Sequence, residues 1–317
     1  MASQQALAVP ALGPDFVGMY ALTNIGAPDP ANITGFLGGY TFLNSSTMLV
    51  SDGAGSADGK IYSIGVARDM DGHITGFSGV SSFYADAPWI DGGLSIGPGG
   101  VLFYTRWPNH ELGQFEAGST LPDRVDSVLE TGFAPSVGAL SFVPSGFAGA
   151  GTLKLASYDT GNWATATLTA DGGGTYDVSV SASPVTLAGG PEGIVYYSGT
   201  NQGFTADSVL ISEATYDNTQ AYAQISAYEI DANGDPIYTN DPLQRRVFIW
   251  GYQGFFGGAV DPLTGDLVFM GFDEFDAYHT IIVEALPPPP PPTVPAPGSV
   301  ALLGLGLLGL GVYRRRA

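Results

Sequence analysis

Cysteine is absent from the 317 residues of this chain, and histidine occurs only three times. Without cysteine there is no disulfide, no thiolate metal ligand and no cysteine nucleophile. None of His73, His110 and His279 stands in a metal-ligand spacing such as H-x-x-x-H, so a zinc site or a histidine triad would need distant loops. We therefore expect no catalytic residue and no cofactor of these kinds, and a fold held together by its core.

Basic residues are also scarce, with 10 Lys and Arg against 30 Asp and Glu. Three of the basic residues, Arg314, Arg315 and Arg316, lie at the extreme C-terminus. Before residue 287, seven basic residues therefore oppose all thirty acidic ones, a formal charge of −23. Such a surface repels nucleic acid and anionic lipid headgroups, which excludes both as partners of this part of the chain.

Helical periodicity is almost missing from residues 15–286. Only residues 122–130 are predicted to form two helical turns, behind a proline at the first position. Elsewhere, short runs typical of β-strands alternate with clusters of Gly, Asp, Asn and Pro. The expected strands are 61–66, 101–105, 153–157, 164–169, 176–181, 194–198, 208–213, 224–230, 247–250, 267–270 and 280–284.

Glycines introduce the apolar strands at intervals of 54, 46, 51 and 68 residues, beginning at Gly38-Gly39, Gly92-Gly93, Gly138, Gly189-Gly190 and Gly257-Gly258. This spacing is near the length of a four-stranded propeller blade, whose inner strand crowds a central channel where only small residues fit. The body thus resembles the β-propellers as a class. We predict an all-β propeller of five to six blades over residues 15–286, the sixth pairing residues 15–21 with the final strands; β-sandwich domains are the alternative.

The last thirty-one residues differ in kind from the body. The six prolines at 287–292 favour polyproline II, which predicts a linker over 287–293. Residues 299–313 are uncharged and rich in Leu and Gly. As a helix they reach about 22 Å, against a hydrocarbon core of about 30 Å, so we expect a short transmembrane helix. The arginines that follow place the C-terminus in the cytoplasm and the body on the opposite side.

The elements of residues 294–317 resemble the PEP-CTERM protein-sorting signal of Gram-negative bacteria that make exopolysaccharide. Val294-Pro295-Ala296-Pro297 matches its Val-Pro-Glu-Pro element, with Ala296 where Glu is usual, and Arg314, Arg315 and Arg316 match its basic end. The resemblance implies recognition near Val294–Pro297 by an exosortase, a membrane cysteine protease-transpeptidase. It also implies anchoring in the inner membrane before processing, and then release or transfer to the cell surface. A plain C-terminal tail anchor or a structureless apolar tail is the alternative.

The N-terminus carries a weaker sign of export. Exported chains begin with a basic and then an apolar segment, but residues 1–14 show only Ala6-Leu7-Ala8, which suits a cleavage site. We interpret residues 1–14 as a remnant or truncated export signal. Export is therefore inferred from the other end of the chain.

Two motifs associated with chemistry have simpler structural interpretations. Gly93-Leu94-Ser95-Ile96-Gly97 fits the nucleophile elbow, but the following Pro98 stops the helix that the elbow needs. Residues 69–74 and 231–235 resemble fragments of calcium loops, yet both lack the bidentate glutamate. Hairpin turns explain the same residues, because Asp and Asn side chains accept hydrogen bonds from nearby backbone N–H groups. Calcium is the one cofactor that stays open.

Three hypotheses for function remain. The first is a non-enzymatic cell-surface or extracellular-matrix protein, with an exosortase and exopolysaccharide as partners. The second is a secreted, calcium-dependent propeller hydrolase or lactonase, which requires convergent acidic side chains with disturbed pKa values in a deep pocket. The third is a carbohydrate-binding surface protein, which requires exposed aromatic side chains such as Trp89, Trp107, Trp163 or Tyr216.

Overall fold

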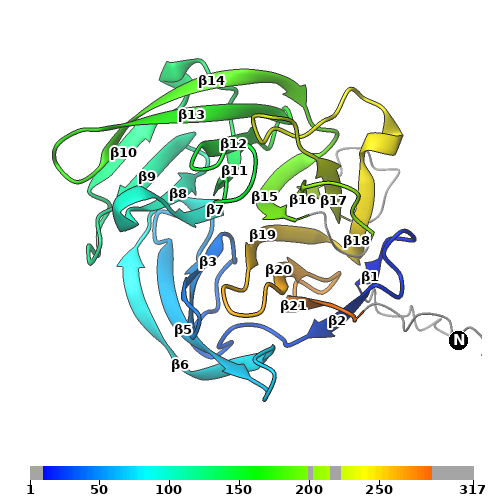
Figure 1. Cartoon of the computed structure of the whole chain (residues 1–317). Helices are drawn as coiled ribbons and strands as arrows, with labels where there is room; N and C mark the ends of the chain where they lie inside the picture. Colours follow the sequence, from blue (N-terminus) through cyan, green and yellow to red (C-terminus); the bar gives the residue numbers. More distant parts are fainter. Residues whose placement is uncertain (1–9, 199–202, 215–222, 288–317) are drawn as a thin grey trace, which may run out of the picture. The chain divides into compact units, whose positions relative to one another are not determined.

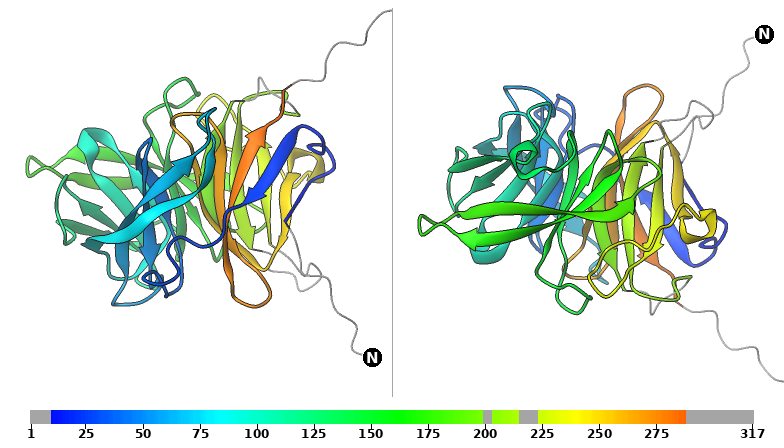
Figure 2. Two further views of the ribbon diagram at one scale, coloured as in Figure 1. Left: turned by 90° about the horizontal axis from the view of Figure 1, so that it is seen from below. Right: turned by 90° about the horizontal axis from the view of Figure 1, so that it is seen from above.

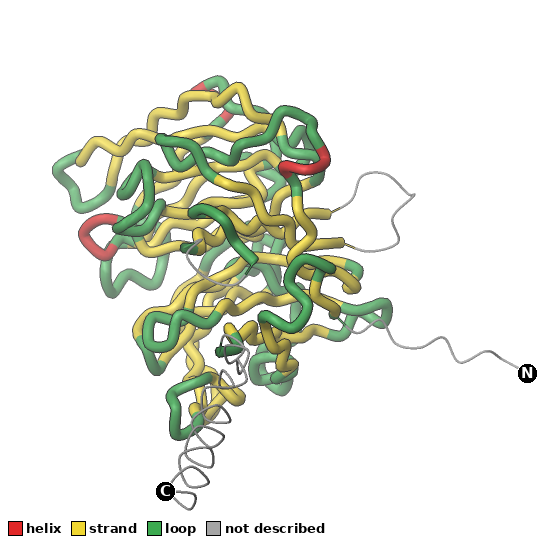
Figure 3. Tube along the Cα trace, turned by 45° about the vertical axis from the view of Figure 1, so that its right-hand side comes forward, coloured by secondary structure: helices red, strands yellow, loops and turns green. Residues whose placement is uncertain are grey.

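The computed structural model describes residues 10–198, 203–214 and 223–287. Within these ranges the chain forms twenty-one strands in five antiparallel sheets, arranged around a ring (Figure 1). Helix is limited there to three 3-10 turns, η1 (Pro98–Gly100), η2 (Leu129–Thr131) and η3 (Pro242–Gln244), among the strands and loops of Figure 3. The fold is a five-bladed β-propeller, which confirms the predicted class.

Each blade runs from an inner to an outer strand. Blade 1 holds β3 (Tyr40–Asn44), β4 (Thr47–Asp52), β5 (Lys60–Arg68) and β6 (Ile74–Asp86). Blade 2 holds β7 (Ile90–Ile96), β8 (Leu102–Arg106), β9 (Glu111–Phe115) and β10 (Arg124–Ser127). Blade 3 holds β11 (Val137–Phe142), β12 (Leu153–Ser157), β13 (Asn162–Ala170) and β14 (Tyr176–Thr186).

The first strands of the chain close the ring. Blade 4 holds β15 (Gly190–Tyr197), β16 (Ser208–Ala214), β17 (Ala223–Glu229) and β18 (Arg246–Tyr252), and β1 (Ala11–Leu12) joins its outer edge. Blade 5 holds β19 (Gly254–Val260), β20 (Leu267–Phe272), β21 (Tyr278–Ala285) and β2 (Tyr20–Asn24). The expected pairing of the N-terminal segment with the final strands is therefore present, but it completes the fifth blade and builds no sixth.

Each expected strand overlaps an observed one, whereas the expected helix at residues 122–130 is wrong. Arg124–Ser127 instead forms β10, paired with β9 from Arg124 opposite Gln114 to Ser127 opposite Glu111, and η2 follows. The segment supplies the fourth strand that blade 2 needs. The backbone hydrogen bonds of that pairing outweigh a weak local preference for helix.

The hydrophobic core consists of five clusters, one at each junction between neighbouring blades. Because side chains alternate along a strand, each blade presents apolar residues to both of its neighbours. Trp163 and Tyr228, for example, are fully buried between blades 3 and 4. In the edge-on views of Figure 2 the strands run between the two faces of the ring.

Glycines bring the inner strands together at the axis. A Cβ atom on Gly92 would lie 2.4 Å from the carbonyl oxygen of Glu192 and 2.7 Å from that of Gly138, in blades 4 and 3. A Cβ on Gly257 would lie 3.1 Å from the carbonyl oxygen of Gly92, on the far side of the ring. The backbones therefore touch across the axis, and the channel is constricted at this level. In blade 4 the glycine at the constriction is Gly193, a few residues beyond the expected Gly189-Gly190.

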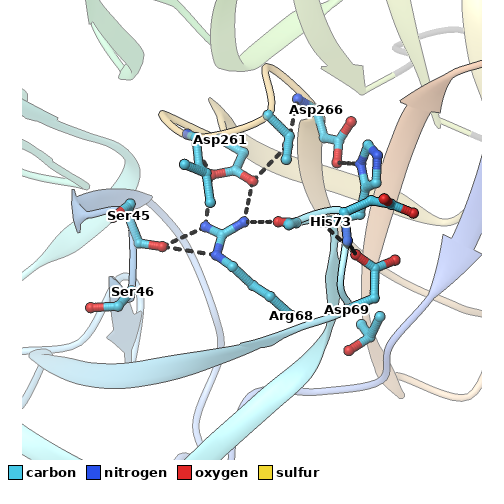
Figure 4. A network of polar contacts seen from close by, with 12 residues as sticks. Ser45, Ser46, Arg68, Asp69, His73, Asp261 and Asp266 are labelled. Atoms are coloured by element: carbon cyan, nitrogen blue, oxygen red, sulfur yellow. Dashed lines mark hydrogen bonds and ion pairs between the residues drawn. The ribbon is translucent and has the colours of Figure 1, made fainter.

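A polar clasp joins the first blade to the last (Figure 4). Arg68, at the end of β5, donates two hydrogen bonds to the carboxylate of Asp261, at 2.6 and 2.8 Å. Asp261 lies in the β19–β20 turn and is 1% exposed. Burial raises the pKa of Asp261, but hydrogen bonds from Arg68 and Thr264 outweigh that effect and leave it below its usual value. The pair therefore stays ionised at neutral pH.

A second clasp joins blades 3 and 4. Lys154 is 1% exposed and donates to Asp235 Oδ1 at 2.6 Å, and the same oxygen accepts a hydrogen bond from Trp163 Nε1 at 2.8 Å. Arg124 of blade 2 likewise forms ion pairs with Asp171 and Asp177 of blade 3. Basic side chains thus connect neighbouring blades.

The constriction predicts that Gly92→Ala destabilises the fold. The added methyl group meets two backbone oxygens that belong to different blades and cannot move independently. We expect a loss of about 1–3 kcal/mol in the free energy of unfolding, measured by urea denaturation. Gly76→Ala is the matched control, because a Cβ at Gly76 in β6 meets nothing within 4 Å. Equal effects of the two substitutions would contradict the constriction.

Candidate functional site

Two pockets lie at opposite ends of the inner strands, separated by the glycine constriction. The neutral pocket, about 370 Å³, is lined by later residues of these strands, including Thr41, Asn44, Ser95 and Ser141. The acidic pocket, about 270 Å³, is lined by residues at or before the starts of the inner strands and by turns between the second and third strands of blades. Its charged side chains are Asp91, Asp159 and Glu192.

The propeller register places two carboxyl groups at one level of the acidic pocket. Asp91 directly precedes Gly92 in β7, and Glu192 directly precedes Gly193 in β15. These glycines both belong to the constriction, so the residues before them occupy equivalent positions in blades 2 and 4. Asp159 comes from the β12–β13 turn of blade 3, which lies between those two blades.

The protein environment disfavours the charged forms of both carboxyl groups. Burial raises the pKa of Asp91 from 3.8 to about 7, against the hydrogen bond from the backbone N–H of Gly92. Burial also raises the pKa of Glu192 well above its usual value, and the neighbouring charge of Asp91 adds to the effect. Each residue keeps partial exposure through the pocket mouth, but the surrounding protein removes much of its hydration.

No basic side chain balances this pair. The lining of the acidic pocket contains no Lys, Arg or His. All seven basic residues before position 287 have partners elsewhere in the described ranges: Lys60, Arg68, Arg106, Arg124, Lys154, Arg245 and Arg246. The carboxyl groups therefore face the pocket as acceptors with no internal cation to satisfy them.

Aromatic side chains form much of the remaining wall. Trp107, in the β8–β9 turn, is 44% exposed and lies against Gly55, where a Cβ would stand 3.0 Å from the indole ring. Phe36 is 49% exposed, and its ring makes an edge contact with Phe256. Tyr158 lines the same pocket, and its pKa is raised by burial and by the charges of Glu192, Asp91 and Asp159.

The hydroxyl group of one residue in the lining of this pocket lacks a hydrogen-bond partner. Ser136, directly before β11, is 1% exposed, and its Oγ makes no hydrogen bond in the described structure. Its backbone has φ of 65°, in the left-handed region that most residues avoid. A buried hydroxyl without a partner costs free energy, and so does the left-handed backbone at this position.

The structure separates the other residues that the sequence singled out. Ser95 lies in β7 and is followed by η1, so the helix of a nucleophile elbow is missing there. His73 hydrogen-bonds Asp266 at 2.7 Å beside the Arg68 clasp, and that bond raises its pKa (Figure 4). His110 Nδ1 accepts from the backbone of Ser136, and His279 contacts Asp273 in blade 5. These histidines form no common site.

The two loops that resemble calcium fragments are turns. Asp69 Oδ1 accepts hydrogen bonds from the backbone N–H groups of Asp71 and His73, at 3.0 and 2.9 Å. Asp231 Oδ1 does the same for Asn233 and Asp235, at 2.8 and 3.0 Å. Across the described ranges, no three His, Asp or Glu side chains are grouped so as to hold a metal ion.

Among the aromatic candidates that the structure describes, Trp107 is exposed and lines the acidic pocket. Trp163 is fully buried, and Trp89 is partly buried beside Ile90. Tyr216, Ala6-Leu7-Ala8 and the tail residues Val294–Pro297 and Arg314–Arg316 lie outside the described residues. Among the residues that are described, no helix is long and apolar enough to cross a membrane.

Asp91 and Glu192 were missed in the sequence, although a signal was there. Both directly precede a glycine of the constriction, but only alignment of blade 4 on Gly193, in place of the expected Gly189-Gly190, brings Glu192 to the level of Asp91. The composition of the chain made the pair hard to recognise, because any two of thirty acidic residues can lie close together by chance.

Comparison with family models identifies the tail. Residues 293–316 match the model described as the PEP-CTERM protein-sorting motif. The chain carries a PEP-CTERM sorting motif. This confirms the expected signal at 294–317 and implies an exported protein with a membrane-anchored sorting signal that an exosortase recognises. No curated protein matches the sequence.

Solved structures similar to the chain share low sequence identity with it. Virginiamycin B lyase from Staphylococcus aureus is 14% identical over 85% of this chain and 75% of its own, with a TM-score of 0.37. A luciferin-regenerating enzyme is 11% identical over 84% and 96%, with a TM-score of 0.41. A putative 6-phosphogluconolactonase from Bacteroides uniformis is 9% identical over 76% and 69%, with a TM-score of 0.37.

The raised pKa values predict a pH dependence of stability. Asp91 and Glu192 bind protons more tightly in the folded than in the unfolded protein, so they make folding less favourable as pH rises from about 4 to about 7. The double variant Asp91→Asn, Glu192→Gln removes that loss. We expect the free energy of unfolding of the double variant to exceed that of the wild type by about 1–2 kcal/mol at pH 8. This figure is reduced for solvent screening at the pocket mouth.

Urea denaturation at pH 5 and pH 8 measures this difference, the lower value being chosen above the isoelectric point of about 4.1. Asp15→Asn removes an acidic charge at an exposed position and controls for general charge repulsion. An advantage of the double variant that is the same at both pH values would contradict the assignment.

Proposed function

We propose that this protein acts at the cell surface or in the extracellular matrix after processing by an exosortase-type peptidase. Its propeller would bind a carbohydrate in the acidic pocket without converting it. The observation that carries this proposal is the exposed indole of Trp107 in the same pocket as the carboxyl groups of Asp91 and Glu192. Neither feature is needed for a protein that serves only as structural material.

The chemistry of the pocket suits a sugar. The apolar face of a sugar ring stacks on aromatic side chains, and its hydroxyl groups donate hydrogen bonds to carboxyl oxygens. A volume of about 270 Å³ suits one small group of a longer chain better than a large cofactor. The exopolysaccharide around such cells is a ready source of ligand, but an acidic polymer would be repelled by the net negative charge of the body.

A second candidate is hydrolysis of a glycosidic or ester bond. It is favoured by the pKa of Asp91, which at about 7 suits a general acid or base near neutral pH, and by the carboxyl group of Glu192 beside it. The calcium-dependent form of this candidate gains no support from the described residues, which offer no three-ligand group. Binding without turnover accounts for the pocket and requires fewer functional groups beyond those that line it.

The tail predicts a processed C-terminus. Intact-mass spectrometry of protein from its native envelope should find truncation near Pro297 and loss of Arg314, Arg315 and Arg316. Pro295→Ala with Pro297→Ala should leave the full-length chain in the membrane fraction, whereas Pro290→Ala, a matched change in the linker, should not. A wild-type chain that retains its three arginines would reject processing.

The pocket predicts that Trp107→Ala weakens sugar binding. Loss of a stacked aromatic ring should lower affinity about tenfold, as measured by calorimetry with the oligosaccharide that gives the strongest signal on a glycan array. Trp250→Ala is the control, because Trp250 is 45% exposed but lies in β18 of blade 4, outside this pocket. Release of products from the bound sugar would favour the hydrolase. An affinity of the Trp107→Ala variant for the sugar equal to that of the wild type would reject the site.

A further inference from the structure

The acidic pocket is lined by three carboxyl groups, those of Asp91, Asp159 and Glu192, and by no basic side chain. Asp91 and Glu192 repel each other across the pocket, and no ion pair in the described ranges involves either of them. A neutral sugar hydroxyl can hydrogen-bond the two carboxyl groups, but it does not relieve the repulsion that arises when both are ionised.

A cation relieves that repulsion, and the rest of the wall indicates which kind. Calcium requires six to eight oxygen ligands, and no three acidic or histidine side chains of the described residues are grouped to supply them. Aromatic faces attract organic cations, and Trp107, Phe36, Phe256 and Tyr158 line this pocket. A primary ammonium group has three N–H donors, so it can hydrogen-bond two carboxyl groups at once.

We propose that the acidic pocket recognises an ammonium group carried on a sugar, that is, an amino sugar whose nitrogen is not acetylated. This inference rests on the proposed carbohydrate binding and names its ligand class. Asp91 and Glu192 accept hydrogen bonds from the ammonium group, and Trp107 stacks on the ring. The negative charge of the body attracts a polymer of such units, which is positively charged.

The decisive comparison uses two probes that differ only at nitrogen: a glucosamine tetramer and the same tetramer fully N-acetylated. Calorimetry with the full propeller at neutral pH should show the free amine binding about tenfold or more tightly, because charge-assisted hydrogen bonds exceed neutral ones. Tetramethylammonium, whose charge does not titrate and which donates no N–H, should compete weakly with the amine.

Two variants test the residues. Asp91→Asn with Glu192→Gln should remove the preference for the free amine and keep binding of the acetylated tetramer, whereas Asp15→Asn should change neither.

The outcomes separate this inference from the proposal beneath it. Equal affinity for the two tetramers, unaffected by the Asp91 and Glu192 substitutions, would overturn ammonium recognition and leave carbohydrate binding standing. Binding of neither tetramer nor of any sugar on the array would overturn both. Tetramethylammonium binding without sugar binding would retain a cation site and reject the sugar.

Discussion

The close approach of five inner strands at one level of the axis is the constraint on which the rest of this structure depends. Glycine at 38, 92, 138, 193 and 257 lets carbonyl oxygens of one blade occupy the space where another residue would carry its Cβ. That contact divides the channel into two separate pockets. It also sets the position of the residue before each glycine, and so brings Asp91 and Glu192 to the same pocket from two blades.

The few basic residues then decide how charge is distributed. Arg68, Arg124 and Lys154 connect neighbouring blades, and Arg245 forms an ion pair with the fully buried Glu213 within blade 4. A buried carboxylate without its partner would be costly, so these cations are committed to structure. The acidic pocket is left without one. The chain has few basic side chains. They are used in the ion pairs that stabilise the ring, and none is left to line the acidic pocket.

Much of the fold was predictable, because glycine at blade-length intervals reports directly on a backbone too crowded for side chains. The helix expected at residues 122–130 was wrong because the propeller places this segment beside β9. Pairing with β9 outweighs the local preference of the segment for helix. The number of blades could not be predicted, because it depends on the pairing of Tyr20–Asn24 with Tyr278–Ala285. These two strands lie at opposite ends of the body in the sequence. In the site, exposure separated Trp107 from the fully buried Trp163, two tryptophans that look alike in the sequence.

The amino-acid sequence by itself determined that the chain carries a sorting signal and which class of fold its body has. A sorting motif is recognised as a linear segment, and strand-forming runs punctuated by glycine encode an all-β fold locally. Only the tertiary structure decided that the ring has five blades and that Asp91, Ser136 and Glu192 share one pocket. The reason is physical: these residues lie far apart along the chain, and only packing of the blades around the axis brings them together.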